Sequence, residues 1–125
     1  MALVIEKSVA MRVLEAAAVC CIGAGDAARE STLAGLDLGI PGGDDAHCVV
    51  VADRRRIEVV VEPGCDLGAL RGRLEALSRR DWEIVVLVPL TDVGAAHGVL
   101  RGTTCRLQPW WLDGATVQFG ASEIP

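Results

Sequence analysis

The first pattern along the chain is a helical repeat of apolar positions near the N-terminus. From Ile5 to Ile22, apolar residues recur at helical spacing, and polar residues line the opposite side of the same helical wheel. The pattern predicts one amphipathic helix, and the stripe expected to face the core comprises Ile5, Val9, Val13, Ala16 and Cys20. Gly23 and Gly25 predict its end, because glycine readily leaves helical geometry.

The next segment carries weaker signals. The carboxylate of Asp26 can accept a backbone N–H as a helix N-cap, so we expect a second, short helix from Asp26 to about Leu36. The stretch from Gly39 to Asp45 holds one proline and three glycines in seven positions, which predicts a loop.

The middle of the chain changes to the two-residue period of strands. Two runs rich in β-branched residues, His47–Ala52 and Ile57–Glu62, are separated by a short charged segment and predict a hairpin. Because side chains alternate across a strand, Glu58 and Val60 are expected on one face, opposite Ile57 and Val59.

The second half of the chain alternates helix and strand patterns. We expect a helix with Asp66 as its N-cap and an apolar stripe of Leu67, Leu70, Leu74 and Leu77. The aliphatic run Glu83–Val88 predicts a strand covered on both faces, and a weak helix is expected at Thr91–Leu100. A second hairpin is expected from Cys105–Leu112 and Ala115–Phe119, which are joined by an Asp-Gly turn. The chain is thus predicted to be an α/β protein whose mixed central sheet contains two hairpins and has helices packed on its faces.

Length and composition agree with one globular domain. The 125 residues, 51% of them hydrophobic, are expected to form a single domain over 1–125. Twelve basic against seventeen acidic residues give a formal charge of −5, which argues against non-specific attraction to DNA or to an anionic membrane. The scarcity of aromatic residues argues against binding of single-stranded nucleic acid by stacking.

Cysteine usage bears on the compartment. The five cysteines form an odd set without a Cys-x-x-Cys pair, so a disulfide framework is not expected. Cys20, Cys21 and Cys48 lie in apolar runs and are expected to pack as small buried hydrophobic residues in a reducing cytoplasm. No membrane association is expected, because the apolar runs are shorter than the roughly 20 residues that span a bilayer.

One group of residues bears on catalysis. Asp45, or Asp44 beside it, precedes the first hairpin, and Glu58-Val-Val60 lies on its second strand. With the order helix, hairpin, helix, buried strand, this arrangement resembles the restriction-endonuclease-like core over roughly Met1 to Leu112. In that family, acidic residues at such positions hold Mg²⁺, and a Lys two residues after the Glu helps to orient the attacking water.

In this chain Val60 stands where that family has its Lys. The resemblance therefore favours a non-catalytic relative, an inactive nuclease that acts as an accessory or assembly domain through protein–protein interaction. The alternative is a Mg²⁺-dependent nuclease that uses Asp45 and Glu58 for catalysis and metal binding. The plainest interpretation is that Glu58 lies on a solvated face of its strand.

A second pattern fits a dinucleotide-binding fingerprint. The segment Gly23–Ala28 matches Gly-x-Gly-x-x-Ala, and Asp53 follows as a candidate for the ribose contact. This fingerprint normally follows a strand, whereas the residues before Gly23 have the periodicity of a helix. The nucleotide site is therefore kept only as a further alternative, and no cofactor is expected.

Two clusters suggest contacts with partners. The densest basic cluster consists of Arg54, Arg55 and Arg56, which are candidates for contacting an acidic partner. Contact with nucleic acid is less favoured, and a solvated turn is the plain alternative. The last hairpin holds three of the four aromatic residues, Trp110, Trp111 and Phe119. Adjacent tryptophans on a strand point to opposite faces, so we expect one of them to lie at an interface with a protein partner or a second copy, unless a helix covers it.

Overall fold

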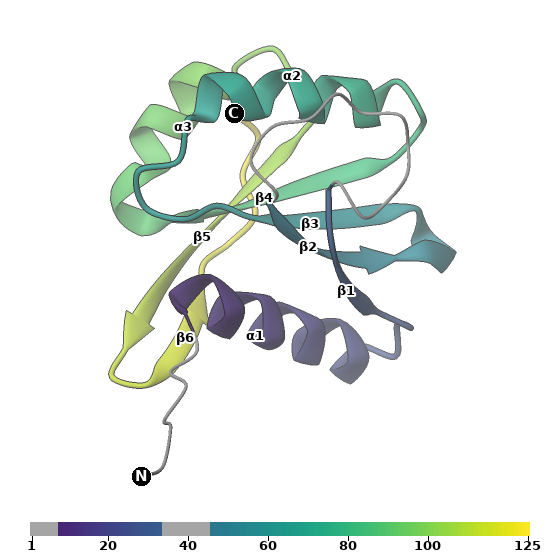
Figure 1. Ribbon diagram of the computed structural model, residues 1–125, viewed down its shortest axis with the longest axis vertical. Helices are drawn as coiled ribbons and strands as arrows, with labels where there is room; N and C mark the ends of the chain where they lie inside the picture. Colours follow the sequence, from purple (N-terminus) through teal and green to yellow (C-terminus); the bar gives the residue numbers. More distant parts are fainter. Residues whose placement is uncertain (1–7, 34–45) are drawn as a thin grey trace, which may run out of the picture.

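The computed structural model describes residues 8–33 and 46–125 and shows a mixed six-stranded, curled sheet with three helices packed on it (Figure 1). The strands follow chain order across the sheet: β1 (Arg29–Thr32), β2 (His47–Val51), β3 (Arg56–Val60), β4 (Glu83–Pro89), β5 (Arg106–Asp113) and β6 (Thr116–Phe119). The helices are α1 (Val9–Gly23), α2 (Leu67–Ser78) and α3 (Val93–Leu100). The predicted α/β class, with a mixed sheet and two hairpins, is confirmed.

The pairing of the strands follows the length of their connections. Strands β1 to β3 form an antiparallel meander, and β5 and β6 form the second antiparallel hairpin. Strands β3, β4 and β5 are parallel, because helices α2 and α3 carry the chain back between them. Both of these helices cover one face of the sheet, and α1 covers the other (Figure 1).

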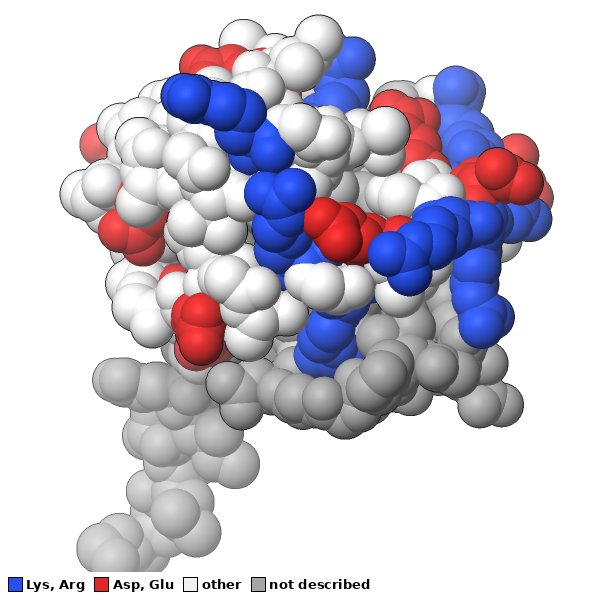
Figure 2. Space-filling model, turned by 90° about the horizontal axis from the view of Figure 1, so that it is seen from above, with Lys and Arg blue, Asp and Glu red and all other residues white. Residues whose placement is uncertain are grey.

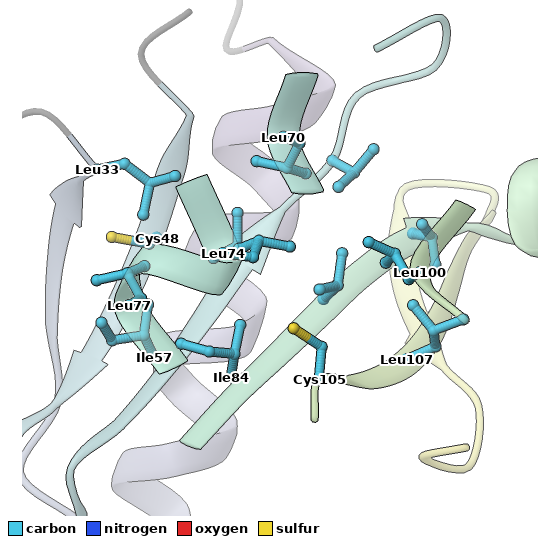
Figure 3. Close-up of a cluster of buried hydrophobic side chains, with 14 of the residues drawn as sticks. Leu33, Cys48, Ile57, Leu70, Leu74, Leu77, Ile84, Leu100, Cys105 and Leu107 are labelled. Atoms are coloured by element: carbon cyan, nitrogen blue, oxygen red, sulfur yellow. The ribbon is translucent and has the colours of Figure 1, made fainter. Parts of the chain in front are cut away.

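The core between the sheet and α2–α3 is built from aliphatic residues at the predicted positions (Figure 3). Asp66 caps α2 as predicted, accepting a hydrogen bond from the Ala69 N–H at 3.1 Å. Leu70, Leu74 and Leu77 of this helix are buried. Strand β4 is buried along almost its whole length, in agreement with its unbroken aliphatic sequence.

The orientation of α1 differs in part from the prediction. Val13 faces the core, but Val9 and Cys20 are exposed and Ala16 is only partly buried. The buried residues of α1 are Ala10, Val13, Leu14, Ala17, Ala18 and Cys21. The helix is apolar on nearly all sides, so periodicity alone did not identify the stripe that packs on the sheet.

The predicted helix from Asp26 is wrong over the residues that the structure describes, because the chain forms the edge strand β1 there. Asp26 does not cap a helix. Its carboxylate binds Arg54 and Arg56 on the β2–β3 hairpin. This contact and the backbone pairing of β1 with β2 replace the local helical bonds. The predicted loop at Gly39–Asp45 and the first residues of the predicted N-terminal helix lie outside the described residues.

The remaining elements match the expected ones, with one difference at α3. A 3₁₀ turn, Leu90–Asp92, precedes α3, so this helix begins at Val93 and not at Thr91. None of the described helices is long and apolar enough to cross a membrane.

Candidate interaction site

An apolar groove lies where β3 and β4 end, beside the C-terminal half of β5 and the first turn of α1. Its volume is about 360 Å³, and its lining residues are Val9, Pro63, Pro89, Leu90, Thr91, Trp110, Trp111 and Leu112. Open α/β sheets bind ligands outside the carboxyl ends of their parallel strands, which is the position of this groove. Its lining favours an apolar guest, because Thr91 contributes its only polar side-chain hydroxyl.

Exposed apolar side chains concentrate around this groove and along the outer side of α1. The large hydrophobic side chains exposed in the described part of the chain are Val9, Val19, Ile22, Leu90, Trp111, Leu112 and Ile124. All except Ile124 either line the groove or belong to α1, and Val9 does both. The α2–α3 side of the molecule is different, since both basic and acidic side chains lie on it (Figure 2).

The two adjacent tryptophans occupy different environments, as strand alternation predicts. Trp110 is 4% exposed and packs in the core beneath α1, whereas Trp111 is 37% exposed. The indole N–H of Trp110 has no hydrogen-bond partner among the described residues. Phe119 pairs with Trp110 across the hairpin and packs partly buried on the same core. Of the three aromatic residues predicted at an interface, Trp111 is therefore the one that offers an exposed surface.

Glu58 is not a solvated residue. Its side chain is 13% exposed and lies 3.4 Å from the Arg56 guanidinium, and the Cys21 thiol donates a 3.1 Å hydrogen bond to it. Arg56 also pairs with Asp26 at 3.3 Å. The end of α1 and strand β3 are thus joined by a polar cluster of Cys21, Asp26, Arg56 and Glu58. Val60, on the same face of β3, is buried among aliphatic side chains.

The three consecutive arginines of the first hairpin bind within the chain, on both sides of the sheet. Arg54 and Arg56 donate hydrogen bonds to Asp26, which follows the C-terminal end of α1. Arg55, in the left-handed conformation with φ 48°, donates hydrogen bonds to the backbone oxygens of Arg80 and Asp81. Its guanidinium carbon also lies 5.0 Å from the centre of the Trp82 ring, a cation–π distance. These contacts give the basic cluster a structural role.

The other candidate residues do not come together. Gly23 ends α1, so the glycines stand at a helix C-terminus, where carbonyl oxygens rather than N–H groups point outward. Asp53 lies exposed in the 3₁₀ turn between β2 and β3. Asp45 lies outside the described residues. Within the described ranges, no three His, Cys, Asp or Glu side chains are placed to share a metal ion.

The environment of each cysteine predicts its reactivity. Burial and the hydrogen-bonded carboxylate of Glu58 raise the pKa of Cys21 from 9.0 to about 11, and burial raises the pKa of Cys105. Cys48 is also buried, whereas Cys20 and Cys65 are exposed, which corrects the expected burial of Cys20. In dilute native protein at pH 8 we expect a thiol reagent to modify Cys20 and Cys65 rapidly and the other three only on unfolding, as followed by mass spectrometry. Rapid modification of Cys21 would contradict this arrangement.

The Asp26 contacts predict an acid-dependent stability. The hydrogen bond from Arg54, supported by the charges of Arg54 and Arg56, holds the pKa of Asp26 below its ordinary value of 3.8. Its stabilising contribution is therefore complete above that value and is lost as the pH falls through the lower folded-state pKa. Urea unfolding between pH 7 and pH 3 should show a smaller acid loss for Asp26→Asn than for the parent protein. Equal pH profiles would exclude this contribution.

The sequence interpretation missed two features of this site. The groove is formed by segments far apart in the chain, so no local motif marks it. The outer side of α1 did leave a signal, because Val9, Val19 and Ile22 cannot all share one buried stripe with Val13 and Leu14.

Comparisons with protein-family models, with curated proteins and with solved structures find no match for this chain.

Proposed function

We propose that this protein is a non-catalytic accessory or assembly domain that binds another protein through the apolar groove and the adjoining outer side of α1. The observation that carries this proposal is the clustering of exposed apolar side chains. Six of the seven such large residues in the described part of the chain belong to these two features. A cluster of exposed apolar side chains of this kind is typical of protein-binding sites, and tryptophan, the residue type of Trp111 at the groove, is enriched at their centres.

The buried residues on β3 support a role without catalysis. The proposal keeps the resemblance to the restriction-endonuclease-like core that the sequence suggests. However, Val60, 3% exposed, supplies no cation at the position of the family's Lys. The carboxylate of Glu58 already pairs with Arg56 and accepts the Cys21 hydrogen bond. These contacts stabilise the packing of α1 on the sheet.

The binding surface is tested by comparing two charge substitutions of exposed aliphatic residues. Leu90→Lys places a charge in the groove, and Ile124→Asp places one at an exposed site outside it. Proteins recovered with the tagged parent from its source cells should be lost with Leu90→Lys and kept with Ile124→Asp, by quantitative mass spectrometry. A recovered protein should then bind in purified form with the same dependence. Equal recovery by all three proteins would refute the groove as the site.

Catalysis is tested directly with nucleic acid. Val60 supplies no ammonium group to orient water, and the Arg56 guanidinium beside Glu58 already pairs with Glu58 and Asp26. We therefore expect no cleavage of plasmid, duplex or single-stranded DNA in the presence of Mg²⁺ or Mn²⁺. Gel electrophoresis over a long incubation measures this. Cleavage that disappears in Glu58→Ala would show instead that the chain is a metal-dependent nuclease.

A further inference from the structure

The groove lies where strand β5 extends beyond its neighbour β4. Strand β4 pairs with β5 only as far as Trp110, which lies opposite Pro89, whereas β5 continues to Asp113. The end of β5 forms a hairpin with β6 that projects beyond β4 (Figure 1). Among the strands that the structure describes, the roughly 10 Å of β5 from Trp111 to Asp113 therefore has a neighbour only on the β6 side.

The hydrogen bonds of β5 show which backbone groups face the open side. Gly120 donates its N–H to the Pro109 oxygen at 2.9 Å, and Leu107 exchanges two backbone hydrogen bonds with Glu123. Odd-numbered residues of β5 thus direct their backbone groups toward β6 and the C-terminal segment, and even-numbered residues direct theirs toward β4. The N–H and carbonyl of Leu112 consequently face the place where β4 has ended, and within the described residues neither has a backbone partner.

The lining of the groove has the form that an added strand requires. Trp110 faces α1, and strand alternation points Leu112 to the same face of the sheet and Trp111 to the other. Side chains from both faces therefore border the groove, which continues the plane of the sheet beyond β4. A helix placed here leaves Leu112 unpaired, because the backbone groups of a helix are bonded internally. An extended segment pairs with Leu112 and directs its side chains alternately to the two faces.

The charges around the groove define the flanks of such a segment. The charged residues adjacent in sequence to the lining residues are Glu62, Asp92 and Asp113, and all of them are acidic. Glu62 and Asp113 are exposed, and Asp92 is half-buried. A guest with Lys or Arg beside its apolar residues is therefore complementary in charge to this acidic rim, and an acidic guest is repelled by it.

We infer that the groove binds an extended, apolar peptide segment with basic flanks, which belongs to the partner protein and adds to β5 as a strand beside Leu112. This inference rests on the proposed function and names the class of partner segment. The apolar side chains of the segment pack against Leu90 and Trp111, and its Lys or Arg residues lie beside the acidic rim. Main-chain hydrogen bonds to Leu112 contribute affinity, and the two apolar walls contribute specificity.

Selection from a library of random, linear peptides tests the chemistry of the guest. Peptides selected on the parent protein and counter-selected on Leu90→Lys should be enriched in Val and Ile at alternating positions, with Lys or Arg at the ends. Enrichment of apolar residues at helical spacing, enrichment of acidic peptides, or no enrichment would overturn the inference.

The two backbone edges of an enriched peptide are then compared. N-methylation of every second residue blocks one edge of a strand and leaves the other edge free. By fluorescence anisotropy, one of the two complementary methylated peptides should bind at least about tenfold more weakly than the unmethylated peptide, and the other should bind like it. Equal affinities of the two methylated peptides would exclude strand addition.

Hydrogen exchange measured by NMR locates the added strand on β5. A saturating amount of the unmethylated peptide should slow exchange of the Leu112 N–H at least about tenfold. The N–H of Trp111 is the internal control, since it already faces β6 and should change little. Unchanged exchange at Leu112 would contradict pairing at this edge.

The acidic rim is tested by two matched charge reversals. Glu62→Lys should weaken binding of the basic-flanked peptide by about threefold or more at low salt. Glu30→Lys makes the same change in net charge on β1, at the other edge of the sheet, and should bind the peptide like the parent. Equal affinities of the two variants would remove the basic flanks from the inference.

Failure of this inference is distinguishable from failure of the proposed function. If Leu90→Lys loses a recovered protein that binds through a helix or a folded surface, the extended segment is wrong and the proposed function stands. If Leu90→Lys alters neither protein recovery nor peptide selection, both proposals fail.

Discussion

Replacing Trp110 with Ala is expected to lower the free energy of unfolding by about 3–5 kcal/mol, the usual cost of truncating a buried aromatic residue. Trp110 is almost fully buried beneath α1 and packs with Phe119. Removing its indole ring leaves a cavity between the second hairpin and the helix. Urea denaturation followed by circular dichroism measures the loss.

Trp111→Ala is the matched control, since it alters the adjacent residue of the same strand. Trp111 is partly exposed, so its truncation should cost much less folding stability and should instead weaken binding at the groove. Equal destabilisation by the two substitutions would show that the tryptophans do not divide these roles.

Replacing Leu74 with Ala is expected to cost about 2–5 kcal/mol. Leu74 is fully buried at the centre of the core between α2 and the sheet (Figure 3). Domains of this size are stable by only about 5–15 kcal/mol, so a large part of the folded-state stability would be lost. Thermal and urea unfolding both measure it.

The control for Leu74 is Leu67, which begins the same helix but is only partly buried. Leu67→Ala should destabilise the protein less, because the space that it leaves is open to solvent. A Leu74→Ala protein that unfolds like the parent would contradict the packing of α2 on the sheet.

Local patterns predicted those elements whose signals were strong and unopposed. The β2–β3 hairpin, α2 with its Asp66 cap and the aliphatic strand β4 all occur where the sequence placed them. In each, the periodicity of the side chains, the residues at the ends and the final packing favour the same structure. The alternation that separated Trp110 from Trp111 is of the same kind, because it depends only on the geometry of a strand.

The segment after α1 shows how distant contacts reverse a local signal. Asp26 has the chemistry of a helix cap, but Arg54 and Arg56 compete for its carboxylate across the sheet. Likewise, Glu58 on an alternating strand resembles a solvated residue until α1 brings Cys21 against it. In both cases the interacting residues are far apart in the sequence.

The sequence by itself determined the class of the fold and most of its elements, because strand alternation, helical periodicity and turn residues act over a few neighbouring positions. Only the tertiary structure decided which side of α1 faces the sheet, because that helix is apolar almost all round and the choice depends on the shape of the opposing surface. The same choice left Val19 outside and placed Val9 beside Leu90 and Trp111. The candidate interaction site is therefore a product of packing between distant segments, for which the chain carries no local motif.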